Sequence, residues 1–144
     1  MRLLTTFILL TSLSVAASAE MPAIHLKVSG YTLSAEVAYK KETRIRGLMY
    51  RSSMDKNSGM LFVFPETGHH SMWMINTYIP LSIAFLDKNG VILNIIDMSP
   101  HTRTKHTAAS EAKYALEMNL GWFSAKNINA GQKIMGLEKA PNAE

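Results

Sequence analysis

Short apolar segments separated by turn-forming residues constrain the fold of this chain more than any other feature. Residues 24–28 and 31–39 alternate apolar with polar side chains on either side of the dipeptide Ser29-Gly30. This period of two is typical of strands with one buried face, and a two-residue connection predicts an antiparallel hairpin. The first part of the domain is therefore expected to be sheet rather than helix.

A second hairpin signal lies in the middle of the chain. Residues 79–86 and 91–98 are mostly apolar and flank Asn89-Gly90, a dipeptide that favours a type I′ turn. A continuous apolar run at residues 60–64, ended by Pro65, predicts a further buried strand.

Segments with a helical period are few and short. Ile45, Leu48 and Met49 have the i, i+3, i+4 spacing of a helix with one buried face, although Gly47 weakens that helix. A second short helix is expected within residues 119–128. About six or seven short strands, the last at residues 132–137, then predict an α+β domain: mainly antiparallel β sheet, a partly closed small barrel, with one or two short helices.

The first nineteen residues have the pattern of a secretory signal peptide. Arg2 precedes an apolar run at residues 3–15, and Ala17-Ser18-Ala19 offers small residues for cleavage before Glu20. An uncleaved membrane anchor is the alternative, but the run is short for a span. We therefore expect an exported, periplasmic or extracellular protein with one domain at residues 20–144, a core at about residues 24–137 and a disordered tail at residues 138–144.

Composition excludes several classes of function. The chain has no cysteine, which removes disulfides, thiolate nucleophiles and thiolate metal ligands. Its net charge of +4 is small and its basic residues are dispersed, so neither nucleic acid nor an anionic membrane surface is expected as a partner. No cofactor is expected, and neither is stable membrane insertion after cleavage.

The stretch from Ser71 to Leu81, SMWMINTYIPL, has the character of a site. Trp73 offers a flat apolar wall, and Asn76 and Thr77 can orient a ligand by hydrogen bonds. Two distant segments supply possible partners. Arg44 and Arg51 lie seven residues apart on the expected helix, and Glu117 is expected on the strand face opposite Leu116 and its apolar neighbours.

These six residues (Arg44, Arg51, Trp73, Asn76, Thr77 and Glu117) allow two interpretations. They can form a pocket for a small polar or glycan-like ligand, because the arginine fork suits a carboxylate or phosphate. Alternatively, Arg44 or Arg51 forms a buried structural ion pair with Glu117, while Trp73 belongs to the core and Asn76-Thr77 caps a turn. The sequence leaves both open.

Two further arrangements are weaker. His70, Met72 and Met74 would share one face of an extended strand and would suit Cu(I). Ser82, Glu117, His101 and His106 could supply a nucleophile and a base, but no hydrolase motif is present. The polar segment at residues 99–112 could then act as a lid over the arginines.

Several motifs in fixed order resemble one family, the domain of unknown function 192 (DUF192), from about Leu26 to Leu137. They are Arg44-x-Arg46-Gly47-Leu48-Met49-x-Arg51, Gly59-Met60-Leu61-Phe62-x-Phe64, Trp73-Met74-x-Asn76-Thr77-x-x-Pro80-Leu81, and Leu116-Glu117 with Gly121. The resemblance implies a small, mostly β domain, often exported, with no agreed activity. Where the family commonly has aspartate, this chain has Ser82 and Gln132, so any chemistry of those aspartates is in doubt here.

The sequence thus predicts an uncharacterised exported domain that binds a small ligand or acts as an accessory protein of the cell envelope. A hydrolase or transferase acting on a glycan-like substrate in the envelope is the alternative. No catalytic residue is assigned.

Overall fold

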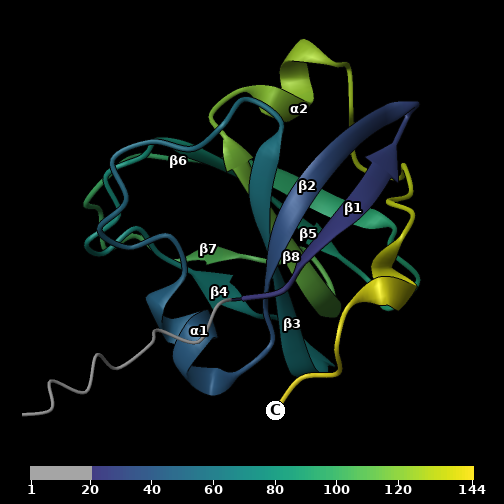
Figure 1. Ribbon diagram of the computed structural model, residues 1–144, viewed down its shortest axis with the longest axis horizontal. Coiled ribbons are helices and arrows are strands. Elements are labelled where there is room, and N and C mark those ends of the chain that lie inside the picture. The colour runs from purple at the N-terminus through teal and green to yellow at the C-terminus, as the bar shows by residue number, and fades with distance from the viewer. Residues whose placement is uncertain (1–20) are drawn as a thin grey trace, which may run out of the picture.

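A six-stranded sheet in the order β1-β2-β3-β8-β5-β6 forms the centre of the domain (Figure 1). The computed structural model describes residues 21–144, so the expected signal peptide and its cleavage point lie outside the described residues. The sheet strands are β1 (Ala23–Val28), β2 (Tyr31–Ala38), β3 (Ser58–Gly68), β5 (Leu81–Leu86), β6 (Ile92–Met98) and β8 (Ala112–Asn119). A separate two-stranded sheet pairs β4 (Ser71–Met72) with β7 (His106–Thr107).

The pairing confirms the predicted α+β fold of mainly antiparallel sheet. β2 and β3 run parallel, and the other neighbours run antiparallel. The segment expected as a last strand, residues 132–137, forms only isolated bridges, in which Met135 pairs with Lys27 of β1 and Lys133 pairs with Val91 beside β6. Because β1 and β6 are the two outer strands, this segment links the sheet edges and partly closes the curled sheet.

Both predicted hairpins form, and the turn of the second differs from expectation. Ser29 and Gly30 have φ values of 48° and 81°, and positive φ at both central residues is what a type I′ turn requires. In the second hairpin, Gly90 has a positive φ of 83° and Asn89 does not, so the expected type I′ turn there is wrong. The Asp87 carboxylate accepts hydrogen bonds from the Asn89 and Val91 amides (2.8 and 2.9 Å) and selects another turn.

The first helix is shorter than its apolar spacing indicated. α1 spans Lys41–Arg46 and ends at Gly47, whose φ of 47° and ψ of −132° are not helical. Ile45, expected on the buried face, is 63% exposed, whereas Leu48 is buried beyond the helix end. A Cβ at Gly47 would lie 3.2 Å from the Phe62 ring. Glycine therefore both ends the helix and allows it to pack closely on β3.

Each face of the sheet covers its own apolar cluster. Leu61, Leu116 and Met118 belong to the first cluster, together with Trp122 and Phe123. These two aromatic residues come from the predicted second helix, α2 (Trp122–Ala125). The second cluster lies on the opposite face, below α1 and the segment around β4; it contains Leu48, Met60, Phe62, Phe64, Met74 and Ile83, among others.

The carboxyl-terminal residues are ordered against the domain, contrary to the predicted disorder of residues 138–144. A short 3₁₀ helix, η1, spans Leu137–Lys139, and the Glu144 amide donates a hydrogen bond of 2.8 Å to the Tyr39 carbonyl oxygen. The sequence pattern missed this contact because it depends on residues more than a hundred positions apart. Within residues 21–144, no helix has the length and apolar character needed to span a bilayer.

Candidate functional site

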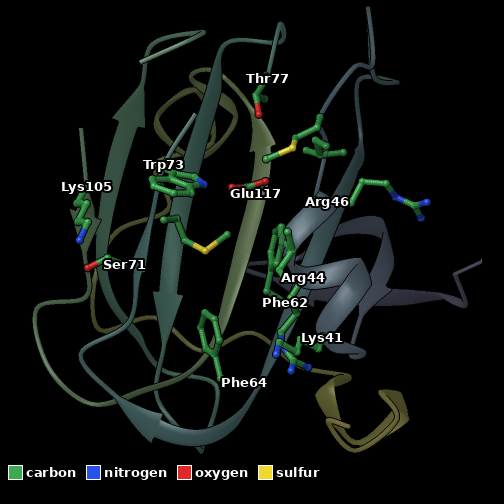
Figure 2. Close-up of a pocket in the computed structure, with 15 residues that line it drawn as sticks. Lys41, Arg44, Arg46, Phe62, Phe64, Ser71, Trp73, Thr77, Lys105 and Glu117 are labelled. Carbon is green, nitrogen blue, oxygen red and sulfur yellow. The ribbon is translucent and has the colours of Figure 1, made fainter. Parts of the chain in front are cut away.

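A cavity of about 490 Å³ opens on the second face of the sheet, between α1, β3, β8 and the β4 segment (Figure 2). Its apolar wall consists of Leu48, Phe62, Phe64, Met72 and Trp73. Thr77 and Glu117 contribute buried polar groups, and Lys41, Arg46 and Lys105 contribute exposed basic ones. Cavities of this size, mostly apolar with a few polar groups, are typical of small-molecule sites.

Glu117 is the most unusual residue of the cavity. The register places it between Met60 of β3 and Ile83 of β5, so its strand neighbours on the same face are apolar. It is 3% exposed. Among the described residues, its carboxyl group has neither an ion-pair partner nor a hydrogen-bond partner. Desolvation by burial raises the pKa of Glu117 from 4.5 to about 8.

A neutral carboxyl group has chemical abilities that a carboxylate lacks. Below pH 8, Glu117 offers one O–H donor and one carbonyl acceptor to the cavity, without a negative charge. Strongly shifted pKa values in a cleft are characteristic of functional sites, although structural groups also show them. The predicted face of Glu117, opposite Leu116, is confirmed by the two apolar clusters.

Trp73 and Thr77 line the same cavity as Glu117. Trp73 is 48% exposed, so the interpretation that it is a core residue is wrong. The Thr77 side chain is buried, and its hydroxyl donates to the Ile75 carbonyl oxygen at 3.1 Å. Two residues of the SMWMINTYIPL stretch thus lie at the same cavity.

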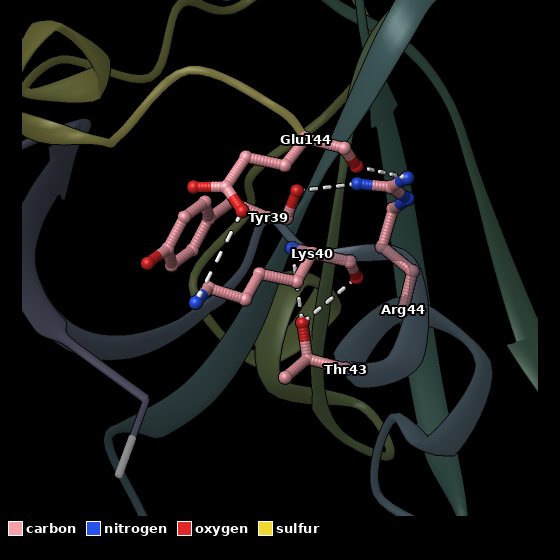
Figure 3. Close-up of polar contacts among 5 residues, drawn as sticks. All are labelled: Tyr39, Lys40, Thr43, Arg44 and Glu144. Carbon is pink, nitrogen blue, oxygen red and sulfur yellow. Dashed lines mark hydrogen bonds and ion pairs between the residues drawn. The ribbon is translucent and has the colours of Figure 1, made fainter. Parts of the chain in front are cut away.

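Arg44 also lines the cavity, but its guanidinium group is engaged elsewhere (Figure 3). It donates hydrogen bonds to the carbonyl oxygens of Tyr39, Val63 and Glu144. Lys40 forms a 4.0 Å ion pair with the Glu144 carboxylate, and Thr43 bonds the Lys40 backbone at the start of α1. Arg44 is thus a structural clamp between the helix and the chain end, and an ion pair with Glu117 does not form.

Arg51 and Asn76 lie outside this cavity. Arg51 forms a bidentate ion pair with Glu36 of β2, whose side chains are about one third exposed. The Asn76 amide donates to the Tyr50 hydroxyl at 3.0 Å, and Asn76 has a positive φ of 52°. These two residues therefore organise neighbouring loops, and the predicted six-residue site reduces to Arg44, Trp73, Thr77 and Glu117.

The family model of DUF192, described as "Uncharacterized ACR", matches residues 24–136. This chain belongs to the DUF192 family. No curated protein matches the chain.

Two solved structures resemble the fold of this chain. One, from Sinorhizobium meliloti 1021 and described provisionally as a transcription regulator, is 33% identical with a TM-score of 0.78; the match covers 81% of this chain and 95% of that one. The other, a protein of unknown function from Novosphingobium aromaticivorans DSM 12444, is 26% identical with a TM-score of 0.78 and coverage of 85% and 91%.

The two positions at which this DUF192 member departs from the common aspartates have structural roles. The Ser82 hydroxyl donates to the Asp97 carboxylate at 2.6 Å and accepts from the Gly121 amide at 2.9 Å. The Gln132 side-chain oxygen accepts from the Asn129 amide at 2.9 Å and closes a turn. Both side chains hold the backbone in place.

The geometry separates the residues of the suggested hydrolase arrangement. Ser82 pairs with Met118 and Glu117 pairs with Ile83 in the antiparallel register of β5 and β8. Directly opposed residues share a face and adjacent residues do not, so Ser82 and Glu117 point to opposite faces of the sheet. His101 packs against the Tyr78 ring, with centroids 4.9 Å apart. A Ser82-based site that includes Glu117 is therefore wrong.

The suggested Cu(I) ligands also have other contacts. β4 ends at Met72, so the extended strand assumed for residues 70–74 does not form. The His70 ring stacks on Phe64 at 3.8 Å and its Nε2 lies 2.8 Å from the Glu66 carbonyl oxygen, while Met74 is fully buried in the second cluster. Within residues 21–144, no three His, Asp or Glu side chains gather as a metal site.

Backbone hydrogen bonds hold the segment at residues 99–112, considered above as a lid, beside the cavity. The Thr102 carbonyl accepts from the Met74 amide at 3.1 Å, and the His101 amide donates to the Thr77 carbonyl at 3.1 Å. Lys105 in this segment lines the cavity. The segment thus forms part of the cavity wall.

Sequence reasoning missed the aromatic wall and the basic side chains of the cavity. The positions of Phe62 and Phe64 could have been predicted. They lie two and four residues after Met60, so the three side chains share one face of β3, and Met60 pairs with Glu117 of β8. Lys41, Arg46 and Lys105 come from segments that meet only in the folded chain, and each looked like an ordinary solvated charge.

Proposed function

We propose that this DUF192 member is a non-catalytic small-ligand-binding protein of the cell envelope, and that its ligand occupies the cavity at Glu117. One observation carries the proposal. A carboxyl group that is buried without a charged or hydrogen-bonding partner costs stability at neutral pH, and it faces a cavity of about 490 Å³. A bound ligand would supply the missing hydrogen bonds.

The walls support binding of a molecule with apolar surface. Phe62, Phe64 and Trp73 offer aromatic faces, and Leu48 and Met72 complete the apolar lining. Aromatic side chains contribute large contact areas at low conformational cost. Thr77 and Glu117 supply the few polar groups that fix the orientation of a ligand.

Ligand binding is tested by a thermal-shift screen of small organic acids, amines, alcohols and sugars against the protein lacking residues 1–19. Trp73→Ala removes one wall, and Tyr31→Ala is its matched control because the two aromatics are 48% and 45% exposed and Tyr31 lies in the first hairpin. We expect compounds that raise the Tm of the wild type and of Tyr31→Ala, but not of Trp73→Ala. No hit, or equal shifts in both variants, would overturn the proposal.

The envelope location rests on the amino-terminal pattern of Arg2, residues 3–15 and Ala17-Ser18-Ala19. Expression of the full chain in a bacterium, followed by fractionation and intact-mass measurement, tests it. We expect a periplasmic or secreted species that begins at Glu20. A cell-associated protein that keeps its first nineteen residues would contradict export and leave the cavity proposal unaffected.

A hydrolase or transferase acting on a glycan-like substrate is the second candidate. The pKa of about 8 at Glu117 favours it, because a carboxyl group that is protonated near neutral pH can act as a general acid. Two-carboxylate glycoside hydrolysis needs a second acid, and Glu117 is the one acidic residue among the described residues of the lining. Glycan products in mass spectra that disappear in Glu117→Gln would establish catalysis.

A further inference from the structure

The charges around the cavity are strongly unequal. Lys41, Arg46 and Lys105 line the cavity and are exposed, which places them at its mouth. Among residues 21–144, none of the three forms an ion pair. Figure 2 shows them on different sides of the cavity, with Lys105 beyond Trp73 and Arg46 on the side of Glu117 away from Trp73. Positive charges without counterions around one cavity raise its potential and favour an anionic ligand.

The fourth basic residue of the lining does not add to this charge in the same way. The Arg44 guanidinium already donates to three carbonyl oxygens, those of Tyr39, Val63 and Glu144. Arg44 also lines the cavity. Arg44 therefore fixes the wall, while the three basic groups at the mouth are available to a ligand.

Glu117 attracts a cationic ligand less than a carboxylate would. Burial raises its pKa to about 8, so at pH 7 it contributes a neutral donor and acceptor at the buried end of the cavity. A cation entering the cavity would pass three positive charges to reach a mostly neutral acid. An anion would keep its charge at the mouth and its apolar part inside.

We propose that the ligand is a free organic acid with an apolar body. The body lies against Phe62, Phe64 and Trp73, and the positive potential that Lys41, Arg46 and Lys105 give the cavity selects an anionic group. This inference rests on the proposed function and narrows it to one ligand class. The volume of about 490 Å³ is that of a site for a single small molecule, which favours a free acid over a membrane lipid with the same charged group.

The test uses three probes with one apolar chain, namely octanoate, 1-octanol and octylammonium, at pH 7. Binding is measured by calorimetry and by fluorescence. The chain has two tryptophans, and Trp122 is buried in the cluster on the opposite face, so a change in emission reports on Trp73. We expect octanoate to bind at least about tenfold more tightly than octylammonium, which corresponds to about 1.4 kcal/mol.

Charge at the mouth is tested by the double variant Arg46→Gln/Lys105→Gln. Its control is Lys88→Gln/Lys133→Gln, which removes the same charge at two exposed positions outside the lining. We expect the first double variant to lose about fivefold or more in octanoate affinity and to keep its affinity for 1-octanol. The control should bind both probes as the wild type does.

Several outcomes would overturn the inference. Equal or tighter binding of octylammonium would do so, as would equal losses of octanoate affinity in the two double variants. Binding to phosphatidylglycerol vesicles without binding of octanoate would identify a membrane surface instead. If none of the probes binds while the general screen yields other ligands, this inference fails and the proposed function stands; if that screen also yields none, both fail.

Discussion

Replacing Glu117 with glutamine should change how stability depends on pH. The usual pKa of 4.5 applies to the unfolded chain, and burial raises the pKa to about 8 in the folded protein. Between these values the folded state holds a proton that the unfolded state has released. The free energy of unfolding of the wild type therefore falls as pH rises from about 4.5 to about 8. Glutamine has nearly the same shape and does not titrate.

The size of the effect follows from the pKa difference. Each unit of pKa corresponds to about 1.4 kcal/mol, so the window from 4.5 to 8 costs the wild type up to about 5 kcal/mol relative to Glu117→Gln. The charged residues that share the cavity are Lys41, Arg44, Arg46 and Lys105. From β3 and β5, Met60 and Ile83 face Glu117 and carry no charge.

Urea unfolding followed by circular dichroism at pH 5, 6, 7 and 8 measures this difference. We expect the difference between the two proteins to be smallest at pH 5 and to grow in favour of the variant by about 1.4 kcal/mol per pH unit towards pH 8. The matched control is Glu111→Gln, at an exposed carboxyl group. A difference between wild type and Glu117→Gln that stays constant from pH 5 to pH 8 would refute the reasoning, because Glu117 would then be ionised and paired in the folded protein.

Three further predictions concern the frame of the cavity. Gly47→Ala should cost about 1–3 kcal/mol, and more than Gly131→Ala. Both glycines have a positive φ, but of these two positions only Gly47 would bring a Cβ into tight contact. Equal losses in urea unfolding would contradict the packing argument. Arg44→Gln should lower the free energy of unfolding by about 1–3 kcal/mol, because it leaves carbonyl acceptors unpaired. Arg51→Gln breaks an ion pair that is about one third exposed and should lower it by about 1 kcal/mol or less. A larger loss in Arg51→Gln would be inconsistent with these roles. Ser82→Ala should lower the Tm without changing ligand affinity, because its hydroxyl serves Asp97 and Gly121 on the other face; a lost affinity with an unchanged Tm would argue against a structural role.

Local patterns predicted the strands well because a period of two needs only neighbouring residues. The hairpin across Ser29-Gly30 and the position of Glu117 on the face opposite Leu116 both followed from such alternation. The helix at residues 41–46 was misread because Ile45, Leu48 and Met49 have helical spacing, yet Gly47 ends the helix between them. The apolar period was correct for Leu48 alone, which is buried by the turn that follows the helix.

The sequence could not predict which groups Arg44 and Arg51 bond. Both arginines were candidates to pair with Glu117, and each bonds another acceptor instead. Arg51 pairs with Glu36 on β2, which lies beside β3 in the sheet. Arg44 donates to carbonyl groups that include that of Glu144, one hundred positions away. A charged side chain pairs with whatever the fold places beside it. The structural interpretation, in which Arg44 or Arg51 forms an ion pair with Glu117, is therefore wrong, and Glu117 lines the cavity without a charged partner among residues 21–144.

The absence of an arginine partner among the described residues makes Glu117 a candidate site residue rather than a structural one. An arginine beside it would have compensated its burial and filled the space that is now open. Instead, the acid lies among apolar neighbours such as Met60 and Ile83, where an apolar side chain would be more stable. A residue that costs stability and faces a cavity is the pattern expected where function opposes stability. The same cavity then joins Trp73 and Thr77, from the stretch that first suggested a site, to basic groups that the sequence alone left apart.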